Sequence, residues 1–320
     1  MATDRLKLDP EIRAFLDGMR ARWAMHPPFA TLDFPAQRAV CEQVRAPLAE
    51  GGPAMVRTIE RLFDPGAGPL HIRAYFPEGA ATPAPALIYL HGGGFTLFSI
   101  DTHDRLMREY AARGDFAVIG VDYPLSPEHK FPEALNRIVA LIRWLDTDGG
   151  EIGVDPGRLA IGGDSAGANL SIAAALRLRD AGESGVLRAI LANYGYFSNA
   201  ISDAAEAQFG GPGSIMDRAE ALSYYDNYLT DPVREAQDPY ACPLHAELTG
   251  LPPTCLVIPE YDVLIEQSLA MARCLAEAGV ATQATVYPGT THSFLEAMSM
   301  AAVARRAISD GAAFIRAYLA

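Results

Sequence analysis

The sequence is poor in basic residues and in cysteine for its length. Its 320 residues include 26 lysines and arginines against 39 aspartates and glutamates, a formal net charge of −13. Such an acidic surface repels nucleic acid and anionic membranes, so we expect neither as a partner. The cysteines form no CxxC pair, which argues against a metal or redox site, and we predict no metal or organic cofactor. The four cysteines are Cys41, Cys242, Cys255 and Cys274.

Long apolar runs and nucleotide-binding fingerprints are also missing. No segment approaches the roughly 18 to 20 apolar residues that cross a bilayer. The first residues, MATDRLKLDPEIR, are charged throughout and lack the apolar centre of a secretory signal, so we expect a cytoplasmic protein. No lysine follows the glycines at 92–94 as a P-loop requires, and the GxGxxG spacing is absent, which argues against a dinucleotide-binding protein.

The chain instead shows a regular alternation of strand and helix. Two helical patterns occupy the first fifty residues, and two alternating segments joined by Asp64-Pro65-Gly66 then predict an edge hairpin over 55–63 and 70–76. Apolar strands and helices alternate after that, which predicts a mostly parallel sheet with helices on both faces. The predicted strands are 86–90, 117–121, 159–162, 189–194, 254–258 and 284–287, and the predicted helices are 102–113, 132–145, 166–180, 264–278 and 301–318.

One long segment breaks this alternation. About sixty residues separate the strand ending at Tyr194 from the strand starting near Thr254, and they are rich in aromatic residues. The segment is either an inserted lid or an irregular surface excursion, and we favour the lid because a catalytic motif lies close by in the fold. Phe95, Phe197 and Phe209 are then candidates either for the walls of a substrate pocket or for the core of the lid.

The most specific motif is Gly163-Asp164-Ser165-Ala166-Gly167. It follows an apolar strand and opens a helical pattern, and in this context GxSxG is typical of a nucleophilic serine at a sharp turn. Glycines two positions on either side let neighbouring backbone pass closely. The N-terminal end of the following helix favours the negative charge that develops in acyl transfer. We therefore predict Ser165 as the nucleophile.

A second motif, His91-Gly92-Gly93-Gly94, follows another apolar strand. Its glycines expose backbone N–H groups, the donors that an acyl-transfer enzyme needs for a tetrahedral oxyanion. His91 precedes the glycines in the wrong place for a general base. We expect its side chain to hold the loop through a hydrogen bond.

The partners of a nucleophilic serine follow it in the order acid, then histidine, in a fold of this kind. Only His245 and His292 come after Ser165, and His245 lies in the irregular segment, whereas His292 follows a strand. The acid is expected at the end of the preceding strand, where Asp262 is our choice and Glu260 the reserve.

These motifs together resemble the bacterial hormone-sensitive-lipase-like esterases, and within them the enterobacterial acetyl esterases. The resemblance runs from about His71 to the C-terminus. Small departures are Thr291 before the histidine and Tyr261-Asp262-Val263 where the family often has Asp-Pro. The motifs are HGGGF at 91–95, DTHDR at 101–105, DYPLSPEHKFP at 122–132, GDSAG at 163–167, Glu260-Tyr261-Asp262 and YPGTTHSFL at 287–295.

The resemblance implies an α/β-hydrolase fold with an eight-stranded, mostly parallel sheet, an edge hairpin and a helical cap. It implies N-terminal cap helices at 1–50, core at 51–195, a cap insertion at 196–248 and core again at 249–320. It implies Ser165, Asp262 and His292 as the catalytic residues. The N–H groups of Gly93, Gly94 and Ala166 are then the oxyanion hole.

We predict a carboxylesterase that hydrolyses short-chain, acetyl-like esters through an acyl-enzyme intermediate. The partner is a small-molecule ester, and a monomer and a homo-oligomer remain the two alternatives for assembly. One rival is an amidase or deacetylase acting on an N-acyl small molecule, because the same residues serve both bonds. A second rival, a non-catalytic ligand-binding homologue, is disfavoured because such proteins lose the histidine that is present here as His292.

Overall fold

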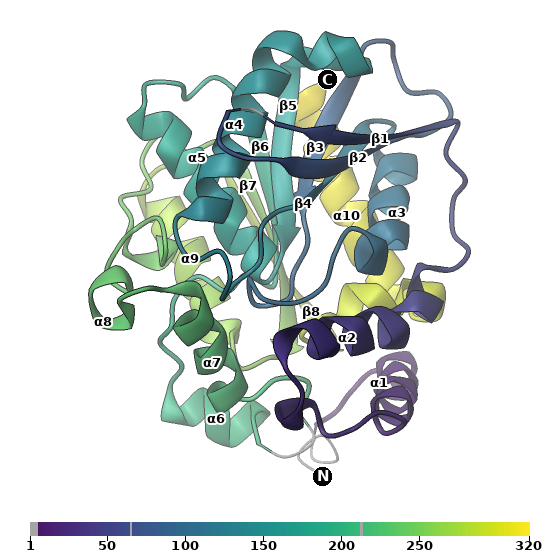
Figure 1. Cartoon of the computed structure of the whole chain (residues 1–320), viewed down its shortest axis with the longest axis vertical. Helices are drawn as coiled ribbons and strands as arrows, with labels where there is room; N and C mark the ends of the chain where they lie inside the picture. The colour runs from purple at the N-terminus through teal and green to yellow at the C-terminus, as the bar shows by residue number, and fades with distance from the viewer. Residues whose placement is uncertain (1–5, 65, 212–213) are drawn as a thin grey trace.

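A single eight-stranded sheet runs through the centre of the molecule in the computed structural model, which describes residues 6–64, 66–211 and 214–320 (Figure 1). The strand order is β1-β2-β4-β3-β5-β6-β7-β8. β1 pairs antiparallel with β2, β2 antiparallel with β4, and every other neighbouring pair is parallel. The strands are β1 (Arg57–Phe63), β2 (Leu70–Phe76), β3 (Ala84–Leu90), β4 (Ala117–Asp122), β5 (Val154–Asp164), β6 (Leu187–Asn193), β7 (Thr254–Tyr261) and β8 (Thr282–Thr291).

The predicted mostly parallel sheet with a hairpin at one edge is therefore confirmed. β1 is the strand at the hairpin edge, and its residues are exposed or partly buried except for Phe63, which is buried. All seven residues of β3 are buried, because a central parallel strand is covered by helices on both faces. Pro65 of the predicted hairpin turn lies outside the described residues.

The helices of the core divide into two groups, one on each face of the sheet. α4, α5 and α9 pack on one face, and α3 and α10 pack on the other. Each aliphatic side chain that they bury fully contributes roughly 1.5 to 3 kcal/mol to the free energy of folding. These helices are α3 (Asp104–Gly114), α4 (Glu133–Asp148), α5 (Ala166–Asp180), α9 (Ile265–Glu277) and α10 (Ala302–Leu319).

The remaining helices gather at the end of the sheet where the parallel strands finish (Figure 1). Those at the N-terminus are α1 (Pro10–Trp23) and α2 (Phe34–Ala49). Those in the long segment before β7 are α6 (Asp203–Phe209), α7 (Arg218–Tyr228) and α8 (Pro232–Glu235). Asp9, Asp33, Ser202, Asp217 and Asp231 each accept a backbone hydrogen bond at the start of one of these helices, which replaces a missing intrahelical partner. No helix in the described ranges combines the length and the apolar character of a bilayer-spanning segment.

Burial separates the cysteines into two classes with different expected reactivity. Cys41, Cys242 and Cys255 are buried, and Cys274 is half-buried. Burial raises the pKa of Cys41 and of Cys255 to about 12, and it also raises that of Cys242. At pH 8, below these values, the three thiols stay protonated and unreactive. We therefore expect the folded protein to react with about one equivalent of a disulfide reagent such as DTNB, and the unfolded protein with all four.

The matched control is Cys274→Ser, which should remove the single fast-reacting thiol and leave the total after unfolding one lower. Two or more rapidly reacting thiols in the folded protein would contradict this assignment of the buried sites.

Candidate active site

Ser165 occupies a strained turn between β5 and α5. Its backbone has φ 53° and ψ −114°, a region that side-chain-bearing residues rarely adopt and that costs about 1 to 3 kcal/mol. Its N–H donates to the carbonyl of Asn193 at 2.9 Å, which ties the turn to the end of β6. A Cβ at Gly163 or at Gly167 would overlap the carbonyl oxygen of Leu90. The two glycines therefore let the end of β3 pass beside the serine.

The structure brings Ser165, His292 and Asp262 into one hydrogen-bonded row. The hydroxyl of Ser165 lies 3.0 Å from Nε2 of His292, and Nδ1 of that ring lies 2.7 Å from Oδ2 of Asp262. The three side chains follow β5, β8 and β7, and they are 6%, 7% and 2% exposed. A serine that donates to an imidazole whose other nitrogen donates to a buried carboxylate is the arrangement that activates a hydroxyl nucleophile.

The two candidate acids at the end of β7 point to different partners. Oδ1 of Asp262 accepts from the N–H of Leu264 at 3.0 Å, which leaves Oδ2 directed at His292. Glu260 accepts from the N–H of Gly289 at 2.7 Å and thereby fixes the last part of β8, which extends to the residue before His292 rather than ending at the predicted Tyr287. The geometry thus favours Asp262, the first choice from the sequence, as the partner of the imidazole.

The segment 292–299, which follows β8 and which we call the histidine loop, is held from several sides, as is the end of β8 before it. The ring of Tyr194 lies edge-on to the imidazole of His292, with 5.0 Å between the ring centres. The hydroxyl of Thr291 donates to the carbonyl of His292 at 3.3 Å. The N–H of Asp9, just before α1, donates to the carbonyl of Gly289 at 3.0 Å, so the N-terminal segment contacts the end of β8 that leads to His292.

Backbone N–H groups without a partner lie on the loop 91–98 that follows β3, which we call the oxyanion loop after its predicted role. Gly93 and Gly94 have φ values of 112° and 59°, which favour glycine. Among the described residues, no hydrogen bond uses the N–H groups of Gly93, Gly94 or Ala166. Ala166 is the first residue of α5, where a free N–H is expected. These three donors are available to an anionic oxygen beside Ser165.

The loop itself is fixed by the residues that flank the glycines. Nδ1 of His91 lies 2.7 Å from the carbonyl of Gly92, and its ring stacks on Tyr123 at 4.4 Å. The hydroxyl of Tyr123 donates to the carbonyl of His91 at 2.7 Å. Burial, with the charge of His103, lowers the pKa of His91, so its ring is neutral near pH 7. His91 therefore holds the loop, as its place in the sequence suggested.

Sequence reasoning missed the role of Asp164 inside the GDSAG motif. Its carboxylate accepts from the N–H of Gly92 at 3.1 Å and from the hydroxyl of Tyr89 at 3.0 Å, and its other oxygen lies 3.3 Å from Nε2 of His103. Burial opposes ionisation, but the charge and hydrogen bond of His103, with the bond from Tyr89, lower the pKa of Asp164 below its usual value. Asp164 thus connects the serine turn to the oxyanion loop. The signal lies in the sequence itself, where Asp164 belongs to the motif GDSAG and His103 to the motif DTHDR.

The three phenylalanines proposed as pocket walls have different positions. Phe95 is 1% exposed and stacks on Tyr228 with 3.9 Å between the ring centres, and Phe197 is completely buried. These two residues therefore belong to the packed core rather than to a pocket wall. Phe209 is the one that lines a pocket.

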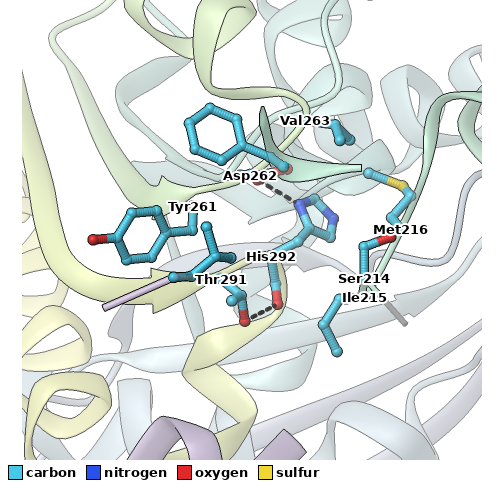
Figure 2. Close-up of a pocket in the computed structure, with 10 residues that line it drawn as sticks. Ser214, Ile215, Met216, Tyr261, Asp262, Val263, Thr291 and His292 are labelled. Atoms are coloured by element: carbon cyan, nitrogen blue, oxygen red, sulfur yellow. Dashed lines mark hydrogen bonds and ion pairs between the residues drawn. The ribbon is translucent and has the colours of Figure 1, made fainter. Parts of the chain in front are cut away.

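That pocket lies beside the acid–histidine pair (Figure 2). Its apolar walls include Phe209, Ile215 and Met216 from the long segment between β6 and β7. Val263, the residue after Asp262, completes them. Figure 2 shows Met216 next to the imidazole, away from the bond to Asp262. On the oxyanion side, the ring of Tyr224 lies so close to Gly94 that a Cβ there would overlap it.

Comparison with known proteins supports the α/β-hydrolase fold and an esterase. Residues 87–296 match a protein family described as having the alpha/beta hydrolase fold. An α/β-hydrolase enzyme from the metagenome of Lake Arreo in Spain is 32% identical, with a TM-score of 0.89 over 97% of this chain and 98% of that one. A hyperthermophilic esterase of the archaeon Pyrobaculum calidifontis is 30% identical, with a TM-score of 0.88 and the same coverage.

The thermophilic carboxylesterase EstE1, cloned from a metagenomic library, is 32% identical, with a TM-score of 0.85 over 91% of this chain and 99% of that one. The family match covers well over half of the chain, and the structural matches extend over nearly all of it. The chain therefore belongs to the α/β-hydrolase-fold family, as one of its carboxylesterases.

Proposed function

We propose that this carboxylesterase hydrolyses esters of short, acetyl-like acyl groups, with Ser165 as nucleophile, His292 as base and Asp262 as the partner of the imidazole. The observation that carries the proposal is the hydrogen-bonded row of these three side chains, at 3.0 and 2.7 Å, beside the unused N–H groups of Gly93, Gly94 and Ala166. A similarity to enterobacterial acetyl esterases in the loops around the site supports the same substrate class.

In the first half of the reaction, Oγ of Ser165 attacks the ester carbonyl carbon, and its proton passes to Nε2 of His292. The carbonyl oxygen becomes an oxyanion, which the three backbone donors stabilise. Asp262 keeps the proton of the neutral ring on Nδ1 and stabilises the imidazolium. Collapse of the tetrahedral intermediate breaks the bond to the alcohol oxygen, which takes the proton from Nε2, and leaves the acyl group on Ser165.

In the second half, water replaces the alcohol. His292 takes one proton from the water as its oxygen attacks the acyl carbon, and the same three donors stabilise the second oxyanion. Collapse breaks the bond to Oγ of Ser165, which recovers its proton from the imidazolium. The products are the carboxylic acid and the free enzyme.

The dimensions of the site support a short acyl group. The pocket beside His292 is small, with only about 10 Å³ of space that a water-sized sphere can enter. The ring of Tyr224 closes the space over Gly94, and its hydroxyl donates to Glu220 at 2.9 Å, one helical turn earlier in α7. An aromatic ring fixed in this way leaves little room for a long chain to pass the oxyanion loop.

A series of p-nitrophenyl esters with increasing acyl length tests the proposal. Each methylene that finds room contributes roughly 0.8 kcal/mol, and a chain that exceeds the available space meets overpacking costs instead. We expect kcat/KM to peak at about two to six carbons and then to fall sharply. We also expect no increase in rate when the substrate forms micelles.

Two outcomes would contradict the substrate class. A specificity that keeps rising to about ten carbons, or a rate that jumps at the micellar concentration, would identify a lipase.

p-Nitroanilides of the same acyl groups, measured in parallel, distinguish an esterase from an amidase, because only the leaving atom differs. We expect the esters to react faster by several orders of magnitude.

A further inference from the structure

The N-terminal helix α2 places a charged side chain beneath the active-site loops. The side chain of Arg45 is only 8% exposed, and its guanidinium forms an ion pair with the carboxylate of Glu296, whose side chain is 4% exposed. Glu296 lies on the short helix η6 (Phe294–Ser299), which begins two residues after His292. Burial lowers the pKa of Arg45, which indicates how costly the site is for a cation.

Stability alone gives a poor account of this ion pair. Desolvating two charges costs several kcal/mol for each ion, and apolar residues of similar volume usually match or exceed the stability of a buried pair. The pair is also poorly supplied with hydrogen bonds, since Nε of Arg45 has no hydrogen-bond partner among the described residues. A buried pair of this kind points to a role in fixing geometry.

The other side of the guanidinium contacts the oxyanion loop. The carbon at its centre lies 4.0 Å from the centre of the Phe98 ring, which is close cation–π contact. Phe98 has a positive φ of 71°, and its ring lies against Gly93, where a Cβ would be 2.8 Å from Cδ2 of that ring. Arg45 is therefore linked to Gly93 through the ring of Phe98. On its other side it is linked to His292 through Glu296, which lies four positions after the histidine in the chain.

The sheet does not set the distance between these two loops directly. The oxyanion loop follows β3 and the histidine loop follows β8, and β5, β6 and β7 lie between those two strands. α2 lies at the end of the sheet where both strands finish (Figure 1). From this position the side chain of Arg45 contacts both Phe98 and Glu296. Oxyanion donors act only when they lie about 2.7 to 3.1 Å from the developing charge, so the relative position of the two loops affects the rate.

We propose that Arg45 is a positioning residue that holds the oxyanion loop, through Phe98, and the histidine loop, through Glu296, in their relative places. The inference rests on the proposed roles of Gly93 and His292. Helix α2 then helps to position the catalytic groups, although it lies more than one hundred residues before Ser165 in the sequence.

The decisive variant replaces both charges with apolar residues, Arg45→Met with Glu296→Leu. It leaves no unpaired buried charge, so we expect a thermal midpoint equal to or above that of the wild type. Loss of the link should lower kcat for a short ester about 10- to 100-fold, because small displacements of catalytic groups have effects of this size. KM should change less than about threefold, because the lost interaction matters in the transition state.

A p-nitrophenyl phosphonate counts competent serines independently of turnover. A bond forms between Oγ of Ser165 and phosphorus, the bond to p-nitrophenolate breaks, and the serine proton passes to His292. We expect one p-nitrophenolate per chain from both the wild type and the double variant, with slower release in the variant. A wild type that releases none would contradict the proposed nucleophile, which separates failure of the proposed function from failure of this inference.

Two further comparisons isolate the link. The matched control, Arg143→Met with Glu183→Leu, removes an ion pair that joins α4 to the segment after α5 at 2.8 Å, away from both loops, and should leave kcat unchanged. Phe98→Leu should lower kcat in the wild type but add nothing in the double variant, because residues linked through a shared partner are not additive.

Wild-type kcat in a folded, fully titratable double variant would overturn the proposal, and so would full additivity with Phe98→Leu. If the double variant does not fold, Arg45→Lys decides. It keeps the charge beside Glu296 but replaces the planar group above Phe98. The proposal then requires a kcat about 3- to 10-fold lower at unchanged KM, and wild-type kinetics would overturn it.

Discussion

Replacing Ser165 with alanine is expected to abolish ester hydrolysis while leaving the fold intact. Without the nucleophile, only the oxyanion donors and substrate binding remain, and we expect kcat to fall about 10⁴-fold or more. Alanine adopts the φ of 53° as readily as serine does, so the strain of the turn is unchanged. The hydrogen bond to His292 at 3.0 Å is lost, which lowers the free energy of unfolding by about 1 kcal/mol and the thermal midpoint by about 1 to 2 °C.

Ser165→Gly is the matched control for the backbone. It should be equally inactive, but glycine relieves about 1 to 3 kcal/mol of strain against an entropic cost of about 0.5 to 1 kcal/mol. We therefore expect Ser165→Gly to unfold at a higher temperature than Ser165→Ala. Activity within about tenfold of the wild type in either variant, purified free of host esterases, would show that another residue is the nucleophile.

The amide variants of the two acids are expected to differ by orders of magnitude. In Asp262→Asn the carbonyl keeps the bond from the N–H of Leu264, so the amide N–H₂ faces Nδ1 of His292. The ring must then carry its proton on Nε2 and can no longer accept from Ser165, which should lower kcat about 10³- to 10⁴-fold. In Glu260→Gln the amide oxygen still accepts from the N–H of Gly289, and activity should stay within about tenfold of the wild type.

Steady-state rates and thermal midpoints of the two variants, measured side by side, make the comparison. A less active Glu260→Gln would show that Glu260 serves the histidine. Similar, small losses in both would mean that the imidazole is oriented by other contacts, for example by the ring of Tyr194.

The predicted strands and helices agree closely with the structure because they depend on local patterns. The helix at 166–180 matches α5 at both ends, since the glycine-rich turn marks its start and its apolar spacing persists to the last turn. Strand ends agree less well. β5 begins at Val154, five residues before the predicted start. The prediction missed these residues because Asp155, Pro156 and Gly157 are typical of turns and interrupt the apolar pattern of the strand.

The principal site motifs could also be recognised in the sequence. GxSxG and HGGG impose steric requirements over five residues or fewer, so the serine turn and the oxyanion loop can be located without a fold. Chain order left His245 and His292, and the position of His292 after a predicted strand then favoured it over His245 in the irregular segment. The family relationship confirms the fold that these motifs predicted.

The relations between loops required the tertiary structure. Asp262 and Glu260 are two residues apart on the same strand end, and only the position of β8 shows that one faces His292 while the other holds Gly289. The same holds for Asp164, whose partners Tyr89 and His103 come from segments more than sixty residues away.

The sequence by itself therefore determined the fold class, because strands and helices alternate along the chain, and it located the serine turn, the glycine loop and the candidate histidine, because these motifs depend on spacing within a few residues. Only the tertiary structure decided which acid meets the imidazole, which ring covers Gly94 and where the charge of Arg45 is neutralised. Those contacts join residues that are distant in the chain. Hydrogen bonds and packing distances of about 3 to 4 Å are set by how the strands and the cap helices are placed in space.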